Sequence, residues 1–318
     1  MAGKVAVEAF ELGKSFGRFN AVDGVTLSIA AGTIFGMLGP NGAGKTTTLR
    51  MLMGIIDPDR GRRTLLGTDT PREAAARIGY LPEERGLYPG MTARDTIAFM
   101  GALRGLPWKE GRARADARLA QLDLGHASAQ KIRKLSKGMA QMVQLVGAMV
   151  HDPDLIVLDE PFSGLDPVNQ ERLEGLVLQQ RDRGATIILS THVMGHAQRL
   201  CDQMTIIAGG RQRFLGSVDE ARATLPLAVR YRPRIDGEDT AVCATLPTDA
   251  HKVDGEWHFT LPDAGIETLL SGLLAGPFGV EALSIQRPDL HEAFMAIVGQ
   301  VKDERHGAPR QPVTGEAA

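Results

Sequence analysis

The chain has 318 residues, which is long enough for about two domains and a buried core. Hydrophobic residues make up 43% of the chain and charged residues 23%, close to the averages of soluble globular proteins, so a largely disordered or membrane-embedded chain is excluded. The 36 Lys and Arg residues balance 38 Asp and Glu residues, which excludes binding of nucleic acid or anionic lipid by bulk electrostatic attraction. An anionic ligand therefore requires a local site.

The cysteines and the apolar runs bear on the redox state of the chain and on whether it contains a signal peptide or a membrane span. Cys201 and Cys243 stand at a spacing that fits no zinc pattern, and we expect both to be reduced thiols rather than a disulfide. The first residues lack the apolar stretch of a signal peptide, and no window of about 18 consecutive apolar residues occurs. We therefore predict neither a signal peptide nor a transmembrane helix.

The first two thirds of the chain predict an α/β fold. An apolar run at residues 32–38 enters a glycine-rich turn, and a helix-forming segment follows. Residues 154–159 and 185–190 are short runs rich in β-branched residues, typical of strands in a parallel sheet that is covered on both faces. Between them, at about residues 91–135, the periodicity is helical, with Thr92 as the expected first N-cap. We predict a helical insertion there.

The pattern changes near residue 225, where short alternating runs begin. We expect strands at residues 227–231, 241–246, 257–261 and 280–285, a helix around residues 266–273, and a last helix whose capping box is formed by Asp289 and Glu292. This predicts a small α+β domain over residues 223–301, after a first domain over residues 1–222. Residues 302–318 are polar and contain Pro and Gly, so we predict a disordered tail.

A phosphate-binding loop is the strongest functional signal. The pattern G-x-x-x-x-G-K-[ST] is matched by Gly39, Pro40, Asn41, Gly42, Ala43, Gly44, Lys45 and Thr46, and Thr47 continues into the helix. In such a loop the glycines let backbone N–H groups face phosphates, the lysine contacts the β- and γ-phosphate oxygens, and the threonine hydroxyl binds Mg²⁺. The sequence therefore predicts a nucleoside-triphosphate site.

Two adjacent acids indicate the other half of that site. Asp159 ends the predicted strand at residues 154–159, and Glu160 follows it directly. Ligands of parallel sheets bind at the carboxyl ends of the strands, so Asp159 is expected to hold Mg²⁺ beside the phosphates.

The order of the remaining motifs resembles the ATP-binding subunits of ABC transporters over about residues 5–220. The resemblance implies that Phe16 stacks on adenine, although Phe19 stands close enough to do the same. It makes Glu160 the general base for water and His192 the sensor of the γ-phosphate. The resemblance also assigns two loops. The signature loop completes the ATP site of a partner subunit through a turn at Gly138, and its residues are Leu135, Ser136, Lys137, Gly138 and Met139. The dimer loop consists of Ser163, Gly164, Leu165 and Asp166.

The sequence departs from the usual family pattern at two places. Glu83 stands where the family has a glutamine, and its carboxylate suits the oxygen ligation that Mg²⁺ prefers. Lys137 and Met139 replace the glycine and glutamine of the usual signature. These variants, with the ending at residues 287–294, are similar to a branch of sodium-extruding and drug-exporting bacterial systems that carry a small C-terminal domain.

The resemblance implies an ATPase that uses ATP and Mg²⁺, dimerises, and drives export at the cytoplasmic face of the membrane through a separate integral membrane permease. We expect no nucleic acid partner. Two alternatives stay open: a soluble ABC ATPase that acts on nucleic acid or ribosomes, and a nucleotide-binding regulator that hydrolyses weakly because of Glu83 and Lys137. Measured turnover separates the regulator from the transporter subunit.

Overall fold

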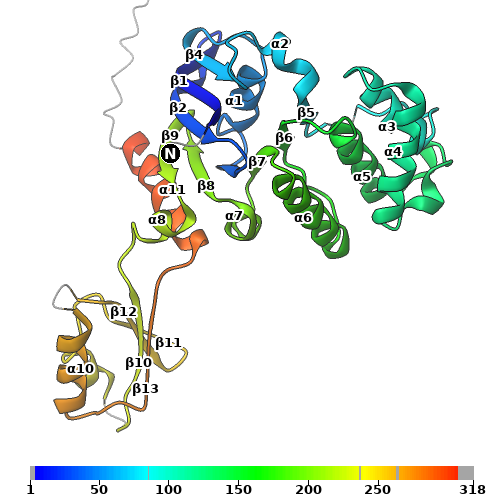
Figure 1. The fold of residues 1–318 in the computed structure, drawn as a ribbon. Helices are drawn as coiled ribbons and strands as arrows, with labels where there is room; N and C mark the ends of the chain where they lie inside the picture. Colours follow the sequence, from blue (N-terminus) through cyan, green and yellow to red (C-terminus); the bar gives the residue numbers. More distant parts are fainter. Residues whose placement is uncertain (1–3, 85, 236–237, 263–264, 307–318) are drawn as a thin grey trace, which may run out of the picture. The chain divides into compact units, whose positions relative to one another are not determined.

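The computed structural model describes residues 4–84, 86–235, 238–262 and 265–306, which form two compact units (Figure 1). One unit comprises Met1–Val218 together with the chain from Ile297 onward, and the other comprises Asp219–Ala296. The two units therefore meet at two boundaries in the sequence, 218/219 and 296/297. The sequence predicted a single boundary between the folded domains, at 222/223.

A six-stranded sheet is the centre of the first unit. Its order is β5 (Ile78–Leu81), β6 (Leu155–Asp159), β7 (Thr186–Thr191), β3 (Ile34–Leu38), β8 (Gln203–Ala208) and β9 (Arg211–Gly216). All neighbours are parallel except β9, which is antiparallel to β8. The three strands predicted from apolar runs are β3, β6 and β7. They lie side by side, so that the chain following each strand emerges at one edge of the sheet.

The composition of β6 explains its position in the sheet. Ile156 and Leu158 belong to one hydrophobic core, and Leu155 and Val157 belong to another. Because successive side chains of a strand point to opposite faces, a strand covered on both faces must be apolar throughout. One core lies against α5 (Lys137–Met149) and α6 (Pro167–Asp182), and the other lies against α1 (Lys45–Leu52).

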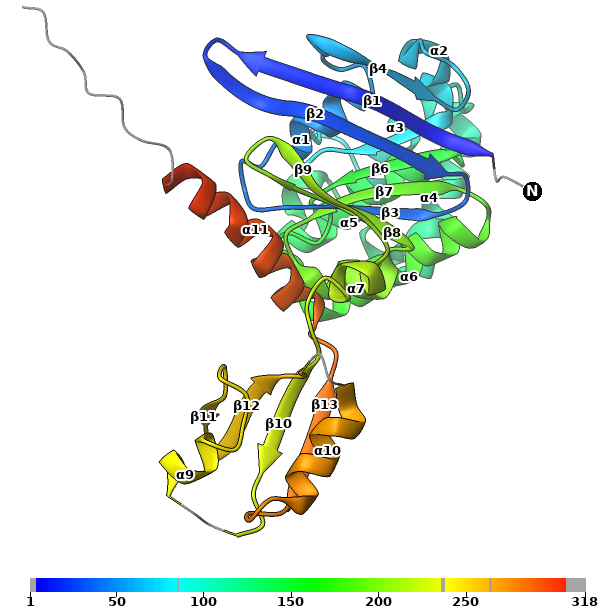
Figure 2. The same cartoon turned by 90° about the vertical axis from the view of Figure 1, so that its left-hand side faces the viewer.

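A three-stranded antiparallel sheet forms a second layer of this unit, with order β2 (Phe19–Ala30), β1 (Val5–Phe16) and β4 (Arg60–Leu65) (Figure 2). Its buried side chains share one core with α1 and the six-stranded sheet. The short helix α2 (Pro71–Ala74) follows β4. The sequence did not predict this sheet, because the pairing of β1 with β2 is interrupted by register shifts that break the alternation of buried and exposed residues.

The predicted helical insertion contains α3 (Ala93–Ala102) and α4 (Trp108–Gln121). Thr92 caps α3 as expected, because its hydroxyl accepts a hydrogen bond from the Asp95 backbone N–H at 3.1 Å. Both helices contribute buried side chains to the core that α5 shares with the sheet. None of the helices in the described part of the chain is both long and apolar enough to cross a bilayer.

The second unit contains an antiparallel sheet in the order β11 (His251–Val253), β12 (Glu256–Thr260), β10 (Ala228–Arg232) and β13 (Ala282–Gln286). Helix α10 (Gly265–Ala275) covers the apolar face through Leu269 and Leu273. The strand predicted at residues 241–246 is wrong, because α9 (Asp239–Cys243) begins there and turns follow. Only one residue of α9, Val242, is buried. So short a segment, with polar and apolar residues mixed, does not distinguish the hydrophobic period of a helix from that of a strand.

The last helix, α11 (Leu290–His306), follows the short α8 (Val218–Arg222) and the sheet in sequence. Its predicted capping box is confirmed: the Asp289 carboxylate accepts from the Glu292 N–H, and the Glu292 carboxylate accepts from the Asp289 N–H, both at 2.8 Å. The helix continues to His306, so the predicted disordered tail is wrong for residues 302–306, and residues 307–318 lie outside the described part.

Both cysteines are free thiols, as expected from the sequence. Burial raises the pKa of the Cys201 thiol to about 12, so this thiol stays protonated and unreactive at neutral pH.

Candidate ATP-binding site

The phosphate loop connects β3 to α1, and two of its glycines have backbone conformations that other residues avoid. Gly44 caps the N-terminus of α1 with φ 107°, and Gly42 has φ 75°. A Cβ on Gly44 would lie 2.5 Å from the Ala21 carbonyl oxygen, whereas a Cβ on Gly42 would meet nothing within 4 Å. Gly44 therefore lets the loop pack against β2, and this contact places Lys45 and Thr46.

This difference predicts unequal effects of two alanine substitutions. Gly44→Ala adds a clash to the strain of a positive φ, so we expect it to lower the melting temperature and weaken ATP binding about tenfold or more. Gly42→Ala adds strain alone and should lower the melting temperature less. Differential scanning fluorimetry and nucleotide titration measure both. Equal effects of the two substitutions would contradict the packing role of Gly44.

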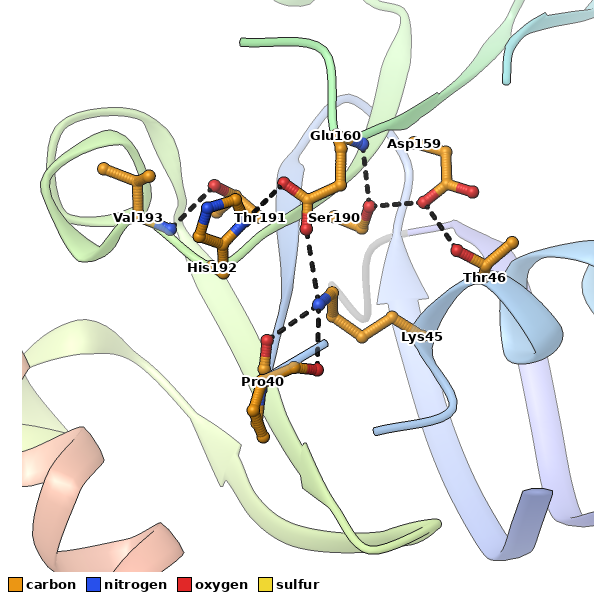
Figure 3. Close-up of polar contacts among 10 residues, drawn as sticks. Pro40, Lys45, Thr46, Asp159, Glu160, Ser190, Thr191, His192 and Val193 are labelled. Atoms are coloured by element: carbon orange, nitrogen blue, oxygen red, sulfur yellow. Dashed lines mark hydrogen bonds and ion pairs between the residues drawn. The ribbon is translucent and has the colours of Figure 1, made fainter. Parts of the chain in front are cut away.

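Lys45 lies at the bottom of the site, with a side chain 6% exposed. Its ammonium donates to the carbonyl oxygens of Gly39 at 2.7 Å and Pro40 at 3.3 Å, and lies 3.3 Å from Glu160 Oε1 (Figure 3). The positive charge thus lies between the backbone of the phosphate loop and Glu160, the acid that directly follows β6. Phosphate oxygens in the loop would compete for the same three N–H donors.

Asp159 and Thr46 are joined across the sheet edge through one carboxylate oxygen. Asp159 Oδ1 accepts from the Thr46 hydroxyl at 3.1 Å and from the Ser190 hydroxyl at 2.6 Å (Figure 3). Ser190 in turn accepts from the Glu160 backbone N–H at 2.9 Å. Sequence reasoning assigned no role to Ser190. Its only signal was its position at the end of an apolar strand, directly before Thr191 and His192.

The second oxygen of Asp159 fits a magnesium ion. Oδ2 is buried and has no hydrogen-bond partner among the described residues, and such an oxygen is a suitable ligand for a hard cation. The described residues contain no group of three or more His, Cys, Asp or Glu that could hold a metal ion alone. A magnesium ion here would therefore be shared between protein oxygens, including those of Thr46 and Asp159, and phosphate oxygens.

Glu160 and His192 meet beside Lys45. Glu160 Oε2 lies 2.9 Å from His192 Nδ1, and the Glu160 side chain is 9% exposed while that of His192 is 49% exposed (Figure 3). Glu160 has φ 49°, a left-handed conformation that is uncommon for a residue with a Cβ. The sharp turn directs the carboxylate away from the strand and toward the phosphate loop.

A cavity of about 390 Å³ lies over the phosphate loop. Glu160 and Glu83 border it, and so does Phe19 rather than Phe16. Phe16 and Phe19 face each other across the β1–β2 hairpin, and both are exposed, at 52% and 63%. The residues that line the cavity are Phe19, Ala21, Asn41, Gly42, Ala43, Gly44, Lys45, Thr46, Thr47, Glu83 and Glu160.

The predicted signature and dimer loops lie at two helix starts. Ser136 caps α5, and its hydroxyl accepts from the Met139 N–H at 3.2 Å, so Gly138 belongs to the first helical turn rather than to a separate glycine turn. Asp166 caps α6 by accepting from the Asn169 N–H at 2.9 Å. Hydrogen bonds from the Asn169 backbone and side chain hold the pKa of the Asp166 carboxyl below its usual value. Within the described chain, neither loop borders the cavity.

This fold and site define a phosphate-loop nucleotide-binding protein, and comparisons with known proteins identify its family. A family model described as ABC transporter matches residues 22–163. The daunorubicin resistance ATP-binding protein DrrA3 of Streptomyces coeruleorubidus is 33% identical over 304 residues, covering 93% of this chain and 96% of that protein. The Nod factor export ATP-binding protein I of Paraburkholderia xenovorans is 40% identical over 216 residues, covering 66% and 70%.

The fold agrees with these sequence matches. A solved structure of an ATP-binding subunit of an ABC transporter is 32% identical, with a TM-score of 0.64, and the match covers 69% of this chain and 92% of that chain. The chain belongs to the ATP-binding subunits of the ABC transporter family. The similarity to a sodium-extruding branch stays a prediction.

Proposed function

We propose that the protein hydrolyses ATP with Mg²⁺ and thereby drives an exporter through a separate integral membrane permease, at the cytoplasmic face of the membrane. One observation carries the hydrolysis: Glu160, the expected base, borders the same cavity as the phosphate loop and contacts both Lys45 and His192. An acid placed in this way can accept a proton from water beside a bound phosphate.

Each residue of the site has a role that its contacts support. Lys45 and the backbone N–H groups of residues 41–46 bind the phosphates, and Thr46 and Asp159 would hold Mg²⁺, which neutralises developing phosphate charge when bound. Glu160 orients the attacking water, and His192 holds the Glu160 carboxylate in place through Nδ1. Glu83 borders the cavity and supplies an additional carboxylate there. Phe19 supports adenine stacking more directly than Phe16, because its ring borders the cavity.

The signature loop is proposed to complete the ATP site of a second ATP-binding subunit. Residues 135–139 stand at the N-terminus of α5, where backbone N–H groups favour an anion. They do not border the cavity of their own phosphate loop. A homodimer would therefore give these donors a phosphate to bind. The dimer loop 163–166 would connect the two sites.

Export is the direction that the relatives favour. One relative is named for Nod factor export and another for daunorubicin resistance, which removal of the drug from the cell would explain. Coupling is tested by reconstituting the protein with its permease in vesicles and measuring ATP-dependent movement of cargo. A protein that turns over ATP but never associates with a permease would favour the soluble alternative.

A mixed dimer tests the shared site. Lys45→Ala damages a subunit's own phosphate loop, and Ser136→Arg damages the site of its partner, so a mixed dimer collects both lesions in one site and keeps the other intact. Each pure variant should be inactive. A random mixture should recover about a quarter of wild-type turnover, because half of the dimers are mixed and each holds one intact site.

The matched control mixes Lys45→Ala with Glu160→Gln, which leaves no intact site under this scheme and should recover nothing. Turnover that stays proportional to protein concentration at high dilution, with no dimer detected by light scattering, would exclude the shared site.

A further inference from the structure

A second pair of side chains joins the two chain segments that carry Glu160 and His192. Phe162 follows Glu160 by two residues, and His196 follows His192 by four, on α7 (Met194–Leu200). Their rings are stacked, with centroids 3.8 Å apart and planes 6° apart. Both residues are buried, at 5% and 3% exposure. The segments after β6 and β7 are therefore joined twice, once through the reacting side chains and once through these rings.

The imidazole of His196 is oriented by α6. His196 Nδ1 lies 2.8 Å from Glu174 Oε1 and 3.1 Å from Arg199 Nη2, and in the tautomer with the proton on Nδ1 the imidazole donates to the carboxylate. Arg199 Nε donates to the other oxygen of Glu174 at 3.1 Å. Burial raises the pKa of Glu174, but hydrogen bonds from Arg199 and His196 outweigh burial and hold that pKa below its usual value. An ionised acceptor thus fixes the plane on which Phe162 stacks.

The left-handed backbone at Glu160 makes this stack important. Such a conformation persists only where the surrounding structure holds it. On the strand side, the Glu160 N–H donates to Ser190 Oγ. On the other side, the Ser163 N–H donates to the Glu160 carbonyl at 3.2 Å, and Phe162 is held by His196. Loss of the stack leaves the second side of the turn with fewer restraints, so the Glu160 carboxylate is held less firmly, by His192 and Lys45 alone.

We infer that His196 and Phe162 are positioning residues for hydrolysis, which hold the Glu160 carboxylate within reach of His192. The inference rests on the proposed ATP hydrolysis. Among the described residues that border the phosphate cavity, neither of the two occurs. Their removal therefore changes turnover and leaves ATP affinity nearly unchanged.

Two substitutions test the inference with little risk to folding. His196→Gln keeps a donor for Glu174 but removes the ring, and Phe162→Leu keeps an apolar side chain but removes the stack. Each should lower kcat about tenfold, while the dissociation constant for ATP changes less than about twofold. The double variant should lose no more than either single variant, because both remove the same interaction. Phe162→Tyr retains an aromatic ring and should retain most of the kcat. His126→Ala, at an exposed histidine, is the matched control.

The outcomes separate this inference from the function on which it rests. Wild-type kcat in both single variants would overturn it, as would additive losses in the double variant. A lowered melting temperature with unchanged kcat per ATP-binding molecule would show a purely structural role and would also overturn it. If the wild-type protein itself hydrolyses no ATP, the proposed function fails, and the inference fails with it.

Discussion

Glu160→Gln is expected to bind ATP with wild-type affinity and to hydrolyse it at least about 100-fold more slowly. The amide keeps the size of the side chain and can still contact His192 Nδ1 and Lys45, but it no longer accepts a proton from water. Because the nucleotide then stays intact, an ATP-bound dimer should accumulate. Phosphate release measures turnover, and light scattering measures the dimer.

Glu171→Gln is the matched control, because Glu171 is an exposed acid on α6 outside the site. It should hydrolyse ATP at the wild-type rate. If Glu160→Gln also retains wild-type turnover, Glu160 is not the base and the proposed mechanism is wrong.

Lys45→Ala should lose ATP binding itself, by about 100-fold or more, because charge-assisted hydrogen bonds to phosphate oxygens disappear with the ammonium. The substitution also leaves Glu160 beside the phosphates without its nearby cation, so the acid repels the nucleotide. Fluorescent-nucleotide titration measures the affinity. The two variants differ in a diagnostic way: Glu160→Gln separates binding from turnover, and Lys45→Ala removes both.

An exposed lysine provides the control for charge alone. Lys109→Ala, on α4, removes one positive charge far from the phosphate loop in sequence and should leave ATP binding unchanged. Wild-type nucleotide affinity in Lys45→Ala would exclude the assigned site.

Sequence patterns predicted those parts of the fold that local chemistry determines. The apolar runs of β3, β6 and β7 are long enough to indicate buried strands, and the glycine pattern fixed the loop that follows β3. The sequence did not predict the three-stranded sheet of β1, β2 and β4, because bulges in these strands interrupt the alternation of buried and exposed residues. In the second unit, α9 was mistaken for a strand because its five residues are too few to show a helical period.

The site shows the same division between local and tertiary determinants. Lys45 and Thr46 follow from the loop pattern, and Asp159 and Glu160 follow from the end of an apolar strand. Phe16 and Phe19 could not be separated, since only the geometry of the hairpin decides which ring borders the cavity. Residues 163–195 separate Phe162 from His196 in sequence, and no local pattern brings the two rings together.

The unit formed by Asp219–Ala296 has a consequence for how this protein can be dissected. It interrupts the other unit in sequence, because the chain from Ile297 onward groups again with Met1–Val218. The smaller unit is therefore an insertion with two covalent attachments rather than an appended terminus. A single proteolytic nick within the smaller unit does not release it, because each of the two pieces stays covalently attached to the larger unit. A stop codon placed before the smaller unit also deletes α11. Isolating the larger unit requires excision of residues 219–296 and rejoining of the two cut ends.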